Sequence, residues 1–118
     1  MKQRLKFQGI ACLAGLLISV LSAQAFAAKS TRFLTASELQ ASLLSDSETI
    51  RFNGRNYIMG VVDSLMLTKS SPVCMDEKTE INTITDLVRL QMQQRPDLLR
   101  YNAASVVREV MAANFPCV

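Results

Sequence analysis

The sequence has 118 residues, enough for one domain, with 13 basic residues, 10 acidic residues, three Cys and neither His nor Trp. Without His, the chain lacks the commonest general base and metal ligand, which excludes Ser-His and Cys-His relays. Three basic residues, Lys2, Arg4 and Lys6, stand at the very start of the chain. The remaining basic and acidic groups balance, which argues against nucleic acid as a partner.

The N-terminal segment is typical of a secretory signal peptide. A short basic stretch precedes an almost wholly apolar run over 10–23, and two small-x-small cleavage sites follow, ending at Ala25 and Ala27. The run covers about 14 residues, whereas a helix needs about 20 to span a bilayer. We therefore expect a signal peptide over 1–27, cleaved after Ala27 or Ala25, and an exported domain over 28–118 with no membrane attachment. An uncleaved anchor is the alternative.

Two cysteines remain after such cleavage, Cys74 and Cys117, because Cys12 lies inside the apolar run. An even pair in an exported protein indicates a disulfide. On the chain-entropy model this bond would stabilise the fold by about 4 kcal/mol, which matters in a domain with a limited core. Two free thiols are the alternative. The sequence has no Cys-x-x-Cys spacing, so it gives no support to a thioredoxin-like role.

The first predicted helix covers 36–44. Thr35 and Glu38 have the spacing of a capping box, in which each side chain accepts a hydrogen bond from the other residue's backbone amide. Leu34 and Leu39 flank this box at the positions of a hydrophobic staple. Two local signals therefore agree on where the helix begins.

The stretch from Glu48 to Val62 allows two interpretations. Asn53 and Gly54 lie between two short segments and resemble the turn of a hairpin. From Tyr57 onward, apolar residues recur in pairs every four positions, which favours a helix over a strand. The pattern therefore predicts a helix over 54–67, with the glycine near its start.

Two further helices are predicted towards the C-terminus. We expect Thr83 to cap the third helix, which ends near Gln94 ahead of Pro96. We expect Asn102 to cap the fourth, whose apolar residues keep helical spacing until Pro116 ends it. The sequence thus predicts an all-α fold, a small bundle of about four short helices. One disulfide would tie the loop before the third helix to the C-terminus.

One side of the second helix needs a separate explanation. Gly60 and Asp63 lie opposite its apolar stripe. Gly inside a helix costs about 1 kcal/mol relative to Ala, so we expect another backbone to pack closely at Gly60, from this chain or from a second copy. A merely tolerated glycine is the alternative, and Asp63 is more typical of a solvated helix charge than of a site.

Acidic residues cluster at Asp76, Glu77 and Glu80, close to Cys74. Their spacing matches no calcium-binding loop, so we expect a solvated acidic loop, which could present its charge to a basic partner, and neither metal nor other cofactor. The sequence has no nucleophile elbow and no glycine-rich phosphate loop. We identify no catalytic residue, and the residues alone predict an exported helical module that acts by binding.

Three segments of the chain follow one another in an order known from one family. The first runs from Tyr57 through Gly60 to Asp63, and the second is a Pro-x-Cys turn at 72–74 before a helix that ends at a Pro-Asp step. The third is the ending Phe115-Pro116-Cys117. Together they resemble the Tai-type immunity proteins, the periplasmic partners of type VI secretion amidase effectors. Many members carry a second Cys pair, which this chain lacks.

The resemblance implies a small, helical, periplasmic homodimer without enzymatic activity. Such a protein binds an amidase effector that cleaves peptidoglycan cross-links and covers its catalytic cleft. We place the contact in the loop between Thr68 and Glu80, which the Cys74 bridge would hold in place. From their position in this loop, the candidate contact residues are Lys69, Ser70, Ser71, Asp76, Glu77 and Glu80.

Two other functions stay open at this point. A periplasmic chaperone or acid-stress protein of the small helical kind would also be exported, disulfide-bonded and dimeric. Since the chain has no His, a pH switch of this kind would depend on carboxylates that titrate below about pH 6. The third interpretation is a scaffold that binds another component of the cell envelope.

Overall fold

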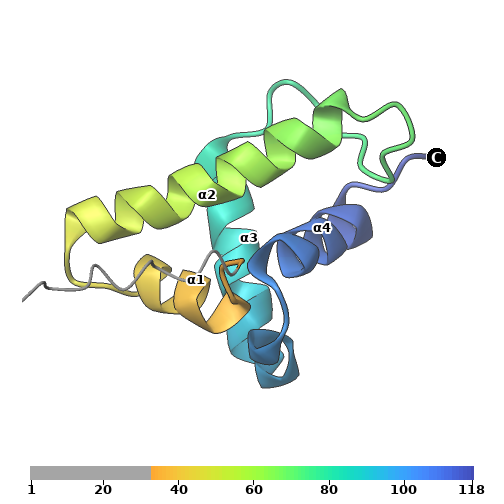
Figure 1. Cartoon of the computed structure of the whole chain (residues 1–118). Coiled ribbons are helices and arrows are strands. Elements are labelled where there is room, and N and C mark those ends of the chain that lie inside the picture. Colours follow the sequence, from red (N-terminus) through yellow and green to blue (C-terminus); the bar gives the residue numbers. More distant parts are fainter. Residues whose placement is uncertain (1–32) are drawn as a thin grey trace, which may run out of the picture. The chain divides into compact units, whose positions relative to one another are not determined.

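The structure is a computed structural model that describes residues 33–118. The predicted signal peptide with its cleavage sites, and Cys12, lie outside these residues. The described chain forms α1 (Ala36–Leu43), α2 (Glu48–Leu67), α3 (Ile81–Gln94), the 3-10 helix η1 (Pro96–Arg100) and α4 (Ala103–Asn114) (Figure 1). Strands are absent from this part of the chain, so the all-α prediction is confirmed. None of its helices has the length and hydropathy needed to cross a bilayer.

α1 begins where the sequence predicts. The Thr35 hydroxyl accepts a hydrogen bond from the Glu38 N–H (3.2 Å), and the Glu38 carboxylate accepts one from the Thr35 N–H (2.9 Å). The predicted capping box is therefore confirmed. Leu39 is fully buried and Leu34 packs against the same core, as their staple positions predict.

The predicted start of the second helix at Gly54 is wrong. α2 begins at Glu48, and the Ser47 hydroxyl caps it by accepting from the Ile50 N–H (3.5 Å). The Asn53-Gly54 pair that resembles a hairpin turn lies inside this helix. The turn signal is local, and the packing of α1 against this part of α2 overrides it.

Gly54 is buried because α1 approaches α2 closely at this point. A Cβ atom on Gly54 would lie 3.0 Å from Cδ2 of Leu43 and 3.2 Å from Cβ of Ser42. Such distances are shorter than ordinary van der Waals contacts between carbon atoms. The glycine thus serves close helix packing and not a turn.

α3 begins earlier than the sequence predicts, so the assignment of Thr83 as its cap is wrong. The N-cap position is Glu80, whose side chain makes no capping hydrogen bond. The Ile84 N–H donates to the Glu80 carbonyl (3.3 Å), so Thr83 already lies inside the first turn of the helix. The helix ends at Gln94 as predicted, and η1, which the sequence analysis did not predict, follows from Pro96.

α4 begins at the predicted cap, where Oδ1 of Asn102 accepts from the Ala104 N–H (2.9 Å). The starts of α1 and α4 are also joined to each other, since Thr35 and Asn102 form an antiparallel bridge. The Ala103 N–H donates to the Leu34 carbonyl (2.8 Å). These bonds fix one end of α4 beside the first helix of the domain.

The core is built from aliphatic and methionine side chains of all four α-helices and η1. Burial of each large apolar side chain contributes about 1.5–3 kcal/mol. Thr85 is the buried polar residue of the described chain. The largest fully buried side chains are Leu39, Ile58, Ile84, Met92, Leu98 and Met111.

The predicted disulfide between Cys74 and Cys117 is confirmed, with 4.8 Å between the two Cα atoms. It connects the loop between α2 and α3 to the segment that follows α4. In Figure 1 this loop and the C-terminal end of the chain lie side by side. The disulfide therefore joins segments that are distant in sequence at one end of the bundle.

Candidate functional site

The loop between α2 and α3, which contains the predicted contact residues, is anchored at its middle. Val73 is 3% exposed and forms an antiparallel bridge with Pro116. The Cys74 N–H donates to the Phe115 carbonyl (2.8 Å). Together with the disulfide, these contacts fix the centre of the loop against the segment after α4.

The Phe-Pro-Cys ending supplies the other half of this anchor. Phe115 is partly buried and packs against the core, while its carbonyl faces the loop. The Cys117 N–H donates to the Pro72 carbonyl (3.3 Å), on the far side of the bridge. The three residues that carry the resemblance at this end of the chain therefore position the loop and do not form a separate site.

The anchor divides the loop into two parts, and we call residues 68–71 the first lobe. Lys69 and Ser70 are exposed, whereas Ser71 is partly buried. The Ser71 N–H donates to the Thr68 carbonyl (3.0 Å), and the Thr68 hydroxyl donates to the Ser64 carbonyl (3.0 Å). The first lobe is thus a short turn held against the end of α2.

The second lobe, residues 76–80, carries the acidic cluster. Asp76, Glu77 and Glu80 are all exposed. The carboxylate of Asp76 accepts from the Lys78 N–H (3.0 Å) and its carbonyl accepts from the Thr79 N–H (2.9 Å), which forms a tight turn. Within residues 33–118 we find no cluster of acidic or Cys side chains that could hold a metal ion.

Tyr57 and Gly60 line a groove of about 540 Å³ between α2 and α4. Apolar side chains of α2, Val61 and Leu65, form one wall, and Arg108 of α4 lies on the other. Burial raises the pKa of the Tyr57 phenol, and the backbone of Ala104 offsets part of this rise. The apolar wall of this groove suits packing against another molecule.

The prediction that another backbone of this chain packs closely at Gly60 is wrong. Gly60 is exposed, and a Cβ atom placed on it would have no heavy atom within 4 Å. The glycine lines the open groove, and close packing by a second copy stays a prediction. Asp63 is exposed on the same helix and is not among the residues that line the groove.

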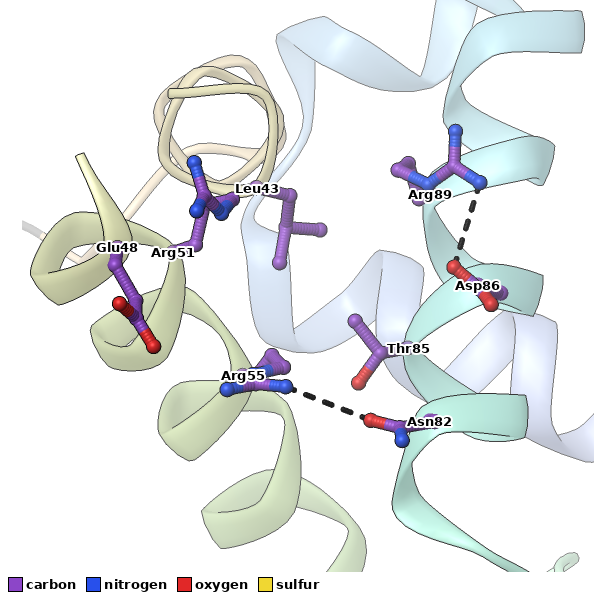
Figure 2. A pocket seen from close by; sticks show the side chains of 8 residues that line it. All are labelled: Leu43, Glu48, Arg51, Arg55, Asn82, Thr85, Asp86 and Arg89. Atoms are coloured by element: carbon purple, nitrogen blue, oxygen red, sulfur yellow. Dashed lines mark hydrogen bonds and ion pairs between the residues drawn. The ribbon is translucent and has the colours of Figure 1, made fainter. Parts of the chain in front are cut away.

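A polar pocket between α2 and α3 was missed by the sequence analysis. It is lined by Arg51 and Arg55 of α2 and by Arg89 of α3, and Figure 2 shows the three guanidinium groups around it. The first two arginines have the i, i+4 spacing of neighbours on one helix face. This signal was lost because the predicted helix began at Gly54.

Comparison with known proteins identifies one family. The family model described as Rap1a immunity proteins matches residues 22–117, which include every helix of the described chain. No curated protein sequence matches the chain at a significant level. The family match is therefore the finding on which a functional conclusion can be based.

Proposed function

The chain belongs to the Rap1a immunity protein family, and from this we propose that it binds a peptidoglycan amidase effector of type VI secretion and covers its catalytic cleft. Membership makes the chain an immunity protein, which implies a cognate effector as its partner. The amidase target and the periplasm as the place of action follow from the resemblance to Tai-type proteins. In this proposal the protein acts by contact and catalyses nothing.

The anchored loop between α2 and α3 is the observation that supports occlusion. A segment that enters an enzyme cleft binds more tightly when it is already ordered, since binding then costs less conformational entropy. The Cys74–Cys117 bond and the pairing of Val73 hold the centre of the loop. Both lobes leave side chains exposed for contact, among them Lys69 and Glu77.

The acidic second lobe would guide association. Exposed carboxylates raise the rate of encounter with a basic surface, and this effect weakens as salt increases. Asp76, Glu77 and Glu80 are exposed on one short segment beside the anchor. We therefore assign the second lobe to a basic rim of the effector cleft.

A homodimer is the second part of the proposal. The groove at Gly60 has an apolar wall and space for another backbone. We assign it to a second copy of the chain. Analytical ultracentrifugation should show a dimer that Gly60→Leu dissociates without loss of helix content, and a variant that stays dimeric would remove this assignment.

The central test is inhibition of a candidate amidase, taken from the neighbouring gene. We expect a stable complex and loss of cross-link cleavage when the two purified proteins are mixed. Tight binding that leaves cleavage intact would contradict occlusion. Glu77→Lys should slow association several-fold at low salt, whereas Asp63→Lys makes the same charge change at an exposed residue outside the loop and should leave the rate unchanged.

A further inference from the structure

The pocket between α2 and α3 concentrates positive charge, and we call it the guanidinium pocket. Arg51 and Arg55 come from neighbouring turns of α2, and Arg89 comes from α3 on the opposite wall (Figure 2). The pocket has a volume of about 400 Å³. Glu48 and Asp86 are the acidic residues on its walls, so basic groups outnumber acidic ones.

Two of the three guanidinium groups are not neutralised by a carboxylate. Arg89 forms an ion pair with Asp86 (3.3 Å). Within residues 33–118, Arg51 and Arg55 form no ion pair. Arg51 donates to a backbone carbonyl of the α1–α2 connection, and Arg55 contacts Oδ1 of Asn82 at 3.5 Å, the limit of a hydrogen bond. Both groups can therefore donate to an anion.

A buried hydroxyl in the wall of the pocket lacks a hydrogen-bond partner. Thr85 of α3 is 7% exposed, and its Oγ1 is the buried side-chain polar atom of the described chain that remains unsatisfied. Figure 2 shows this oxygen on the side of Thr85 that faces Arg55 and Asn82. Arg55 is held there by one long hydrogen bond and a contact with the exposed ring of Phe52, so a small movement of its side chain can admit an acceptor oxygen that also satisfies the Thr85 hydroxyl.

An exposed aromatic residue beside the pocket favours a protein ligand over a free anion. Phe52 is 52% exposed, and the guanidinium carbon of Arg55 lies 5.9 Å from the centre of its ring. Arginine and aromatic residues are enriched among the residues that contribute most to the binding energy of protein interfaces. A small free anion would make no contact with Phe52.

We propose that the guanidinium pocket binds a side-chain carboxylate of a protein partner. Guanidinium groups give a carboxylate paired, charge-assisted hydrogen bonds, and the Thr85 hydroxyl supplies one more donor. Exposed Phe52 would cover an apolar residue next to that carboxylate. The identity of the partner as a cognate effector rests on the proposed function. The binding of a carboxylate by the pocket does not depend on that function.

The test uses two short peptides and the purified protein with its disulfide intact. Acetyl-Leu-Glu-Phe-amide carries the carboxylate, and acetyl-Leu-Gln-Phe-amide has the same shape without the charge. Titration followed by nitrogen-15 NMR should shift the backbone amides of Arg51, Arg55 and Thr85 with the acidic peptide. The neutral peptide should bind at least about ten-fold more weakly. Equal binding of the two peptides would overturn the proposal.

Glutarate and inorganic phosphate are the probes for a free-anion site. We expect both to bind more weakly than the acidic peptide, because neither contacts Phe52. If either binds as tightly as the peptide, the pocket is a general anion site and the assignment to a protein carboxylate is wrong.

Two variants separate recognition from a structural role. Thr85→Val keeps the shape and removes the unsatisfied hydroxyl, so Tm should rise by about 4 °C or more while affinity for the acidic peptide falls about ten-fold. A rise in Tm with unchanged affinity would overturn the role given to Thr85. Arg55→Gln should weaken binding at least about ten-fold, whereas Arg100→Gln, on η1 and outside the pocket, should not.

The peptide test needs no amidase, so a negative result in it can be distinguished from a failure of the proposed function. Absence of peptide binding together with intact amidase inhibition would overturn only the role proposed for the guanidinium pocket. Peptide binding without amidase inhibition would support the pocket and contradict the amidase as the target.

Discussion

The two glycines of α2, Gly54 and Gly60, differ in the space available for a side chain. A Cβ atom on Gly54 would meet α1 at 3.0 Å, whereas one on Gly60 would meet no heavy atom within 4 Å. The same substitution therefore has different consequences at the two positions. Helical periodicity identifies which side of a helix lacks apolar residues, but it does not reveal what packs there, and this is why the prediction for Gly60 failed within the chain.

Substitution of each glycine by Ala tests this difference. We expect Gly60→Ala to raise the free energy of unfolding by about 0.5–1 kcal/mol, because Ala is the better helix former and the space is open. At Gly54 the contact with α1 should offset that gain, and Gly54→Val should cost about 1–3 kcal/mol through overpacking. Urea denaturation of dilute protein measures each value, and equal stabilisation by Ala at both positions would contradict the packing described for α1.

Tyr57 gives the protein a stability that depends on alkaline pH. Burial raises its pKa, so the folded protein holds the phenol proton more tightly than the unfolded chain. The contribution is complete below the ordinary pKa of about 10 and is lost as pH rises through the higher folded-state pKa. Tyr57→Phe should therefore lose less stability than the wild type between pH 8 and pH 11, as measured by denaturation midpoints. Tyr101→Phe, at an exposed position, is the control.

For the individual helices, capping side chains explain why some N-terminal ends were predicted correctly and others were not. The ends predicted at Thr35 and Asn102 have side chains that accept from backbone amides close by in sequence. The start of α3 has no such side chain, so the prediction rested on Thr83, a residue of a capping type that lies three positions inside the helix. The start of α2 does have a Ser cap, but the Asn53-Gly54 pair inside the helix resembles a turn. The packing of α1 against Gly54 favours the helix over the turn.

Loss of the two threonines should have different effects. Thr35→Ala removes a working cap and should lower the free energy of unfolding by about 1 kcal/mol. Thr83→Ala changes an exposed position inside α3 and should be neutral or slightly stabilising. Chemical denaturation of both variants checks this pair. A loss of about 1 kcal/mol at Thr83 would restore the sequence-based assignment and contradict the helix start seen here.

For the whole molecule, the fold class and the disulfide were predictable and the anchor around the disulfide was not. Helical periodicity and the pair of Cys that follows the predicted signal peptide are properties of the sequence itself. The pairing of Val73 with Pro116 is a backbone contact between distant segments, and no side-chain pattern encodes it. The guanidinium pocket could not be predicted for the same reason, because its arginines come from two helices and only the packing of these helices brings them together.

Removal of the disulfide should destabilise the whole domain. Cys74→Ser with Cys117→Ser is expected to lower the free energy of unfolding by about 4 kcal/mol, since the unfolded chain then loses a long closed loop. Guanidinium denaturation of the oxidised wild type and the double variant measures the difference. Reduced wild-type protein should match the variant. An unchanged midpoint would show that the backbone bridge alone holds the loop.

α2 sets the distance between two surfaces that a partner would have to reach together. About twelve residues of continuous helix separate Arg55 from the first lobe of the loop, which corresponds to about 18 Å. A partner fragment that is shorter than this span can occupy one surface only. A longer one gains from the high effective concentration of its second contact once the first has formed. Selectivity would then come from the reach of the partner as well as from its chemistry.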